Sequence, residues 1–435
     1  MNNSTINRNI LRLALPSIMA NITVPLVGIV DLAIAGRLGD AASIGGIAIG
    51  SMLFDLLYWN MGFLRVGTGG ITAQAFGRSD FKEAMDTFTR GIVTALAVAL
   101  LIWIIQWVYI EAAFALVVCS PEVESIAREY FFIRVWAAPA TLSLMVFKGW
   151  FIGMQNTVLP MAVDITVNVL NVVISYILAV HTPMGVAGVA AGTVVAQYGG
   201  LLLAIILMHS NFREYFHLIS VRASIRLNKM KRFFSINGNL FIRSLCMLVI
   251  YIGFTSIAAK YGDTLLAVSS VMMKLLLLYS YFVDGFAYAG EALVGRFIGE
   301  RNSDSLISTV RLIFIWCFGI SIASTLIYAG LGKPMFRLMT DNPAVVEAST
   351  PFLFWLLLMP VVSCIAFTWD GIFIGATATH HLRNSMIWSA ALFVVTYIVF
   401  EPLLGIQSLY LAYFVHLLVR SLYLTIVRKG ALTVK

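Results

Sequence analysis

The sequence predicts an all-α polytopic membrane protein, with twelve transmembrane helices arranged as two parallel repeats of six. Hydrophobic residues make up 60% of the 435 residues and charged residues only 11%, whereas a soluble globular domain is about 25% charged. About a dozen apolar stretches follow one another between short polar segments, and each is close to the roughly 20 residues that cross a bilayer core. Almost nothing of the chain is left for a soluble domain.

The twelve helices are expected where the apolar stretches lie. Their predicted ranges are 13-36, 44-67, 90-110, 130-153, 160-180, 186-208, 236-259, 266-291, 309-331, 350-374, 385-404 and 408-427. No small-residue cleavage site precedes the first apolar run, so we expect that run to stay as a permanent helix.

Basic residues predict the orientation in the membrane. They gather before odd-numbered helices, as with Arg8 and Arg12 before the first, whereas the opposite loops are short or acidic. The segment 209-235 carries the largest group, namely Arg213, Arg222, Arg226, Lys229, Lys231 and Arg232. Cytoplasmic loops are enriched in such residues. We therefore expect a multi-pass protein of the cytoplasmic (inner) membrane with both termini cytoplasmic, and we assign the net charge of +8 to this bias and not to nucleic-acid binding.

An internal repeat divides the chain. At an offset of 222 residues the tripeptide 151-153 matches 373-375, and Pro121 and Gly77 match Pro343 and Gly299. Six helices per copy give both copies the same orientation, as in many transporters. We predict an N-terminal lobe at 1-208, a cytoplasmic basic linker at 209-235 and a C-terminal lobe at 236-435. Such duplication also occurs in channels and membrane enzymes, but two linked bundles suit alternating access best.

Asp31 is the most informative charge, because it lies inside the first apolar run. A charge at membrane depth costs at least ~2.5 kcal/mol and needs a reason. Burial raises the pKa of a carboxyl group toward the working range, so a carboxylate here can bind and release a proton. A purely structural cap or ion pair is the alternative. Pro16 and Pro25 precede Asp31 in the same helix, and each removes a backbone hydrogen bond. They are candidate hinge residues, although membrane helices also tolerate proline without moving.

Polar residues form a stripe on the helix predicted at 160-180. Asp164, Asn168, Asn171 and Ser175 are spaced 4, 3 and 4 residues apart, which places them on one helical face. Thr193, in the helix predicted at 186-208, is a candidate to continue this polar pocket. Hydrogen bonding between helices is the alternative function of such residues.

Lys148 and Asp370 occupy equivalent positions of the repeat with opposite charge, so they are a candidate ion pair or gate between the lobes. The alternative, which we favour for membrane-depth charges of this kind, is that the long side chains reach the interface. His380 and His381 have no neighbouring ligands in the sequence, so no metal site is assigned.

Several segments together resemble the multidrug and toxic compound extrusion (MATE) family, in its DNA-damage-inducible protein F branch. They are LALPSIMANITVPLVGIVDLAIAGRLG, GFLRVGTGGITAQAFGR, GVAGVAAGTVVAQ, FVDGFAYAGEALVGRFIGE and WDGIFIGAT, and the resemblance runs essentially end to end. It implies a V-shaped exporter of drugs or other amphipathic compounds in exchange for protons or sodium. It also implies a cation site in the N-terminal lobe, which maps onto Asp31, Asn171 and Thr193.

One position departs from the family pattern. Ser175 stands where the family commonly has an aspartate, four residues after Asn171. A second carboxylate would help to bind a dehydrated sodium ion, so its absence favours protons as the coupling ion, with sodium left as the alternative.

We therefore expect a proton-coupled antiporter that is not an enzyme, has no cofactor, and acts as a monomer on small amphipathic or cationic organic compounds in a lipid bilayer. A flippase for lipid-linked or polysaccharide precursors is the alternative. It would need a strongly cationic cleft, whereas the N-terminal lobe carries a carboxylate and amides. An intramembrane enzyme lacks support, since no HExxH or GxSxG motif is present.

Overall fold

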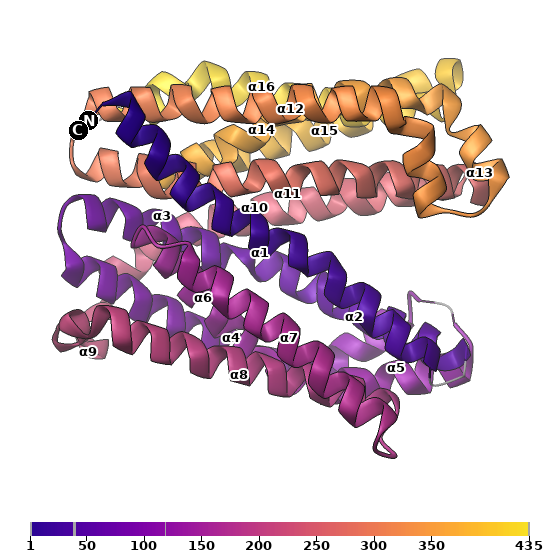
Figure 1. Ribbon diagram of the computed structural model, residues 1–435, viewed down its shortest axis with the longest axis horizontal. Coiled ribbons are helices and arrows are strands. Elements are labelled where there is room, and N and C mark those ends of the chain that lie inside the picture. Colours follow the sequence, from indigo (N-terminus) through magenta and orange to yellow (C-terminus); the bar gives the residue numbers. More distant parts are fainter. Residues whose placement is uncertain (1, 38–40, 118, 434–435) are drawn as a thin grey trace. The chain divides into compact units, whose positions relative to one another are not determined.

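The computed structural model describes residues 2–37, 41–117 and 119–433, and in these ranges the chain is helical with no β-strand. Figure 1 labels the α-helices. Their bounds are α1 Asn3–Arg37, α2 Ala41–Trp59, α3 Phe63–Gly77, α4 Phe81–Phe114, α5 Pro121–Arg134, α6 Ala138–Gly153, α7 Val158–Val180, α8 Val186–Phe212, α9 Val221–Ser224, α10 Leu227–Ala259, α11 Asp263–Gly299, α12 Ser303–Met339, α13 Pro343–Ala348, α14 Leu353–Gly375, α15 Thr379–Leu404 and α16 Gln407–Ala431.

Within the described ranges, twelve helical segments are long and apolar enough to cross a membrane, which confirms the predicted number. Some spans contain two helices joined by a short 3₁₀ turn. Asn60–Gly62 joins α2 to α3, and Val135–Ala137 joins α5 to α6. Each predicted helix lies inside a helical segment, and most segments extend beyond the prediction because polar end residues continue the helix outside the apolar stretch.

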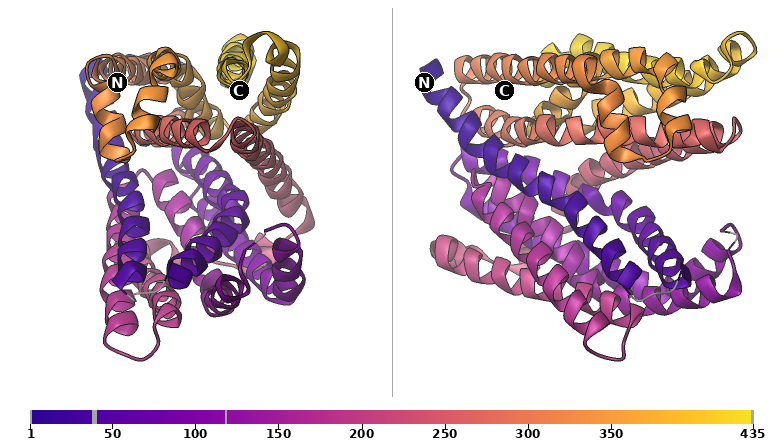
Figure 2. Two further views of the ribbon diagram at one scale, coloured as in Figure 1. Left: turned by 90° about the vertical axis from the view of Figure 1, so that its right-hand side faces the viewer. Right: turned by 45° about the vertical axis from the view of Figure 1, so that its right-hand side comes forward.

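Contacts between Cα atoms divide the chain into two units, one of Met19–Phe234 and one of Met1–Ile18 with Ser235–Lys435. We call them the N-unit and the C-unit. In each unit the long helices run alongside one another as a bundle (Figure 2). The chain passes between the units inside α1 and again inside α10. Pro16 lies two residues before the first of these divisions and Pro25 lies beyond it, and α1 is helical through both.

The first residues of α1 pack in the C-unit. A Cβ atom built on Gly285 of α11 would lie 2.9 Å from the carbonyl oxygen of Ala14, so the two helices approach backbone to backbone. The indole Nε1 of Trp316 donates to Oδ1 of Asn7 at 2.7 Å. These contacts explain why residues that the sequence assigns to the N-terminal lobe group with the C-unit.

The repeat is visible in the backbone as well as in the sequence. Among the residues that the structure describes, four that are not glycine have positive φ, and they form two pairs at an offset of 222, Ser79 with Arg301 and Gln155 with Thr377. Glycine packing repeats too. A Cβ on Gly149 would lie 2.1 Å from the carbonyl oxygen of Arg65, and a Cβ on Gly371 would lie 2.1 Å from that of Ala287, again at the same offset. The α3–α6 contact and the α11–α14 contact therefore share the same close approach of a glycine to the backbone of the neighbouring helix.

The segment predicted as a linker, 209-235, is largely helical and packs on the N-unit. After α8 it forms a 3₁₀ helix at Arg213–Leu218, then α9 and the start of α10. Tyr215 stacks on Phe81 with ring centroids 4.4 Å apart, and Phe212 contacts Trp150 at 4.8 Å. The linker is thus held against α4 and α6 and is not a free connection.

Candidate cation-coupling site

The polar stripe of α7 divides among several partners. Asn171 and Ser175 are buried against α8, whereas Asp164 and Asn168 are half-buried. The four residues do lie on one helix, α7, as the spacing predicted. The spacing did not show which neighbouring residue each side chain contacts.

Asn171 and Thr193 form the centre of the α7–α8 contact. Nδ2 of Asn171 donates to Oγ1 of Thr193 at 2.8 Å, and the Thr193 hydroxyl donates to the carbonyl oxygen of Val189 at 3.2 Å. The same carbonyl accepts from the hydroxyl of Ser175 at 3.2 Å. Asn171 is only 4% exposed, and its Oδ1 has no hydrogen-bond partner in the described part of the chain. An unsatisfied acceptor in such a place is costly.

Glycines of α8 bring the two helices this close. A Cβ on Gly192 would lie 2.6 Å from the backbone N and Cα of Ser175, and a Cβ on Gly188 would lie 2.6 Å from the carbonyl carbon of Leu178. Small residues of this kind are typical of membrane helix interfaces. The polar contacts of Asn171 and Thr193 therefore depend on glycine at these positions.

Asn168 joins α7 to α1. Its Nδ2 donates to Oγ1 of Thr23 at 2.8 Å, and Thr23 in turn donates to the carbonyl oxygen of Ala20 at 2.7 Å. Asp31 belongs to the same helix, but its side chain lies outside the residues that the structure describes. The role predicted for Asp31 therefore stays a prediction.

Lys148 and Asp370, the candidate pair between the lobes, each have a partner within their own unit. Lys148 of α6 forms an ion pair with Asp164 of α7. Asp370 of α14 accepts from Arg243 of α10 and from Arg420 of α16, at 2.6 Å each. Equivalence within a repeat did not indicate these partners, and the pairing of Lys148 with Asp370 between the lobes stays a prediction. Within the described residues, both charges take part in ion pairs between helices of one unit.

The cluster of Arg243, Asp370 and Arg420 was not predicted from the sequence. Of its three residues only Asp370 was a candidate site residue, although Arg420 lies in the middle of a predicted apolar helix. A charge at that depth is a signal that could have been used.

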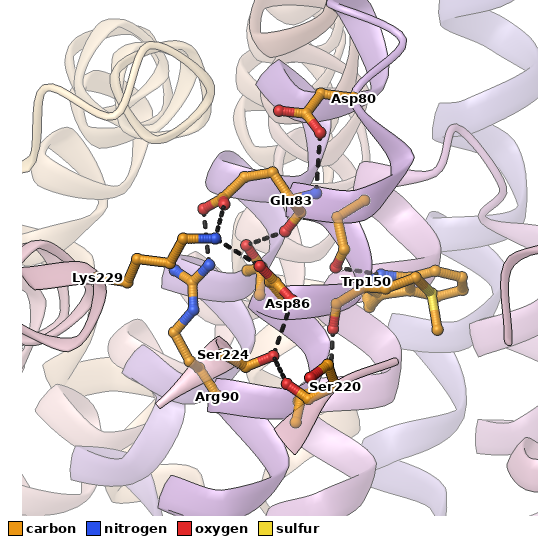
Figure 3. A network of polar contacts seen from close by, with 12 residues as sticks. Asp80, Glu83, Asp86, Arg90, Trp150, Ser220, Ser224 and Lys229 are labelled. Carbon is orange, nitrogen blue, oxygen red and sulfur yellow. Dashed lines mark hydrogen bonds and ion pairs between the residues drawn. The ribbon is translucent and has the colours of Figure 1, made fainter. Parts of the chain in front are cut away.

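A second polar network holds the linker on α4 (Figure 3). Asp86 is fully buried, and it accepts from the hydroxyl of Ser224 at 2.8 Å and pairs with the ammonium group of Lys229. Glu83 contacts both Lys229, at 3.3 Å, and Arg90, at 2.7 Å. Lys229 therefore points toward the carboxylates of α4, while most of the other basic residues of the linker are exposed.

Comparison with known proteins places this geometry in context. A family model described as MatE matches residues 16–177 and again residues 240–403, so one model covers both copies of the repeat. DNA damage-inducible protein F of Escherichia coli (strain K12) is 32% identical over 412 residues, which are 95% of this chain and 90% of the relative. A probable multidrug resistance protein NorM of Neisseria meningitidis serogroup B is 23% identical over 81% of this chain and 79% of the relative.

Solved structures share the fold. The Vibrio cholerae MATE transporter VcmN in its bent form matches with a TM-score of 0.87 and 15% identity, over 99% of this chain and 98% of the other. A MATE structure in the straight conformation matches with a TM-score of 0.87 and 19% identity, over 98% and 97% of the two chains. At these identities the likeness concerns the fold alone.

Proposed function

This chain belongs to the MATE family of multidrug and toxic compound transporters, and on that premise we propose that it exports amphipathic organic compounds in exchange for protons. Family membership supports efflux transport itself. The coupling ion, the coupling residue and the substrate are the parts that we add.

The unsatisfied Oδ1 of Asn171 is the observation that carries the proposal. A protonated carboxyl group is a hydrogen-bond donor, whereas an ionised one is only an acceptor. A neighbouring carboxyl group could therefore satisfy Asn171 in one protonation state and not in the other. This difference is what a proton-coupled switch requires, because a ligand shifts an equilibrium only by its differential affinity for the two states.

Asp31 is the carboxylate that we assign to this role. It follows Thr23 by eight residues along α1, roughly 12 Å at 1.5 Å per residue, and Thr23 is the residue that Asn168 contacts. Eight residues are about 2.2 helical turns at 3.6 residues per turn, so on a regular helix Asp31 is turned by about 80° from Thr23 and lies on an adjacent side of α1. Protonation of Asp31 would remove a negative charge from a membrane-spanning helix and allow α1 to repack, which would lower the affinity for the outgoing substrate.

Transport in inverted vesicles tests this assignment. A proton gradient or a sodium gradient is imposed separately, and uptake of a fluorescent amphipathic dye is followed for the wild type and Asp31→Asn. We expect the proton gradient to drive uptake in the wild type and the variant to lose most of that uptake. Unchanged proton-driven uptake by Asp31→Asn would exclude Asp31 as the coupling residue. Uptake driven only by the sodium gradient would show that sodium, and not the proton, is the coupling ion.

Asp164→Asn is the matched control. It removes the same charge from the same unit, but the carboxylate of Asp164 is already paired with Lys148. We expect this variant to keep proton-driven uptake. A lipid-scrambling assay on the same vesicles addresses the flippase alternative, which predicts lipid translocation in place of dye uptake.

A further inference from the structure

Three charged side chains form a cluster in the C-unit, of which Arg420 is buried and Arg243 and Asp370 are partly buried. Arg243 and Arg420 each donate through Nη2 to the same oxygen, Oδ2 of Asp370, at 2.6 Å. Arg420 is only 2% exposed, and its guanidinium group lies over the ring of Phe367 at 5.9 Å from the centroid. Three helices, α10, α14 and α16, are thus joined through one carboxylate oxygen.

The charges of this cluster do not balance. Two guanidinium groups share a single carboxylate, and no other acidic side chain in the described ranges forms an ion pair with either arginine. The cluster therefore carries one surplus positive charge. Buried cations in membrane proteins are almost always paired, and those that are not tend to mark a ligand or ion pathway.

The cluster also keeps unused hydrogen-bonding capacity. Nε of Arg243, Nε of Arg420 and Oδ1 of Asp370 are buried without a partner among the described residues. His416 lies one turn before Arg420 on α16, interacts with the backbone of Ser389, and has an Nδ1 atom without a partner. A guanidinium group presents its donors as a planar fork that matches a group with two oxygens. Surplus charge and unused donors therefore point to the same kind of ligand.

We propose that this cluster binds the anionic group of an amphipathic compound, a carboxylate or a phosphate, through the donors of Arg243 and Arg420 that Asp370 leaves unused. Asp370 is then an internal counter-ion, which holds both arginines when no ligand is bound. The inference rests on the proposed export function and specifies its substrate class, which is organic acids. The alternative, a purely structural triad, predicts no preference for anions.

A binding assay without any gradient tests the site. Purified full-length protein is placed in nanodiscs of phosphatidylcholine, and the fluorescence of dansylaminoundecanoic acid is compared with that of its uncharged methyl ester. We expect the wild type to bind the acid about tenfold or more tightly than the ester, since a hydrogen bond to a charged group can account for a tenfold change in affinity. Arg243→Gln and Arg420→Gln should each weaken binding of the acid by about tenfold and leave binding of the ester unchanged.

Arg128→Gln is the control variant. Arg128 lies in the N-unit and is held by two carboxylates, Glu111 and Glu124, so its charge is already compensated. Its removal should not change the binding of the acid. Equal affinity of wild type, Arg243→Gln and Arg420→Gln for the acid would overturn the proposal.

Thermal unfolding of Asp370→Asn gives a second readout. This variant leaves the buried Arg420 and the partly buried Arg243 without a counter-ion, so we expect a lower Tm than for the wild type and a larger increase in Tm when the acid is added. If Asp370→Asn unfolds before purification, the binding measurements on Arg243→Gln and Arg420→Gln still test the proposal. Each of these variants keeps one arginine paired with the carboxylate of Asp370, so no charge is left without a counter-ion. No increase in Tm with the acid would count against the site.

Lipid composition decides the source of the anion. If phosphatidylglycerol in the nanodisc competes with the acid for the wild type but not for Arg420→Gln, the site accepts a lipid headgroup. If it does not compete, the site is for solutes. Because no gradient is used, these results stand apart from proton coupling, and loss of coupled uptake without loss of acid binding would reject the proposed coupling alone.

Discussion

At the scale of single residues, the α7–α8 contact depends on the absence of a side chain. Ser175 is fully buried, and Gly192 lies opposite it, where even one methyl group would overlap the backbone of α7. The hydrogen bond between Asn171 and Thr193 lies on the same contact. Ser175, where the resemblance predicts an aspartate, thus occupies a place with little spare volume, and its hydroxyl group donates to the carbonyl oxygen of Val189.

Gly192→Ala tests this packing. The added Cβ would lie 2.6 Å from the backbone of Ser175, so the helices must separate, and overpacking of this kind costs about 1–3 kcal/mol. We expect a Tm lower by several degrees in detergent and weaker proton-driven uptake. Gly319→Ala is the matched control, because a Cβ on this α12 residue would meet nothing within 4 Å. Similar Tm values for the two variants would show that the close approach does not limit stability.

At the scale of elements, the linker is fixed by a carboxylate that has no contact with water. Asp86 of α4 is bound from α9 by Ser224 and from the start of α10 by Lys229 (Figure 3). The chain leaves the N-unit a few residues later, between Phe234 and Ser235. This network therefore anchors the first turn of α10 to α4.

Lys229→Met should loosen the linker. Asp86 would keep Ser224 but lose its cation, and breaking a buried pair costs up to about 5 kcal/mol. Because Lys229 itself is 38% exposed, we expect a smaller local loss of about 1–3 kcal/mol. Trypsin should then cleave after the exposed Arg222 and Arg226 about tenfold faster than in the wild type.

Lys231→Met serves as the control for the protease experiment. It removes one exposed basic residue and one tryptic site from the same segment, but Lys231 has no role in the network. Its cleavage rate at Arg222 should equal that of the wild type. Equal rates in Lys229→Met and Lys231→Met would mean that the ion pair does not hold the linker.

At the scale of the whole molecule, the duplication governs topology. The positive-φ residues recur at an offset of 222. Two helix N-caps recur at the same offset: Oδ1 of Asp80 accepts from the backbone N of Glu83, and Oδ1 of Asn302 accepts from the backbone N of Ser305. Equivalent turns at equivalent ends of the helices are what a parallel repeat requires. If the basic linker is cytoplasmic, as the sequence predicts, the other connections that precede odd-numbered spans are expected on the same side of the membrane.

Thiol labelling tests that orientation. In a background without the four native cysteines, Arg226→Cys in the linker and Thr182→Cys in the short loop between α7 and α8 are exposed to a membrane-impermeant maleimide. We expect labelling of Thr182→Cys in intact cells and of Arg226→Cys only in inverted vesicles, because basic loops stay in the cytoplasm. The reverse pattern would place both termini outside the cytoplasm.

The sequence alone determined the number of membrane helices, the repeat and the transporter family. Each of these depends on apolar length, on a constant offset or on contiguous motifs, which are local properties of the chain. It also placed Asn171 and Ser175 on one face, since helical periodicity is local too.

Only the tertiary structure decided which side chains meet. It paired Lys148 with Asp164, brought Arg420 to Asp370, and tied Lys229 to a buried Asp86 more than a hundred residues away. The first residues of α1 likewise grouped with the C-unit through Gly285. Partner choice among buried charges depends on distances of a few ångströms between helices that are remote in sequence, and neither periodicity nor repeat offset contains that information.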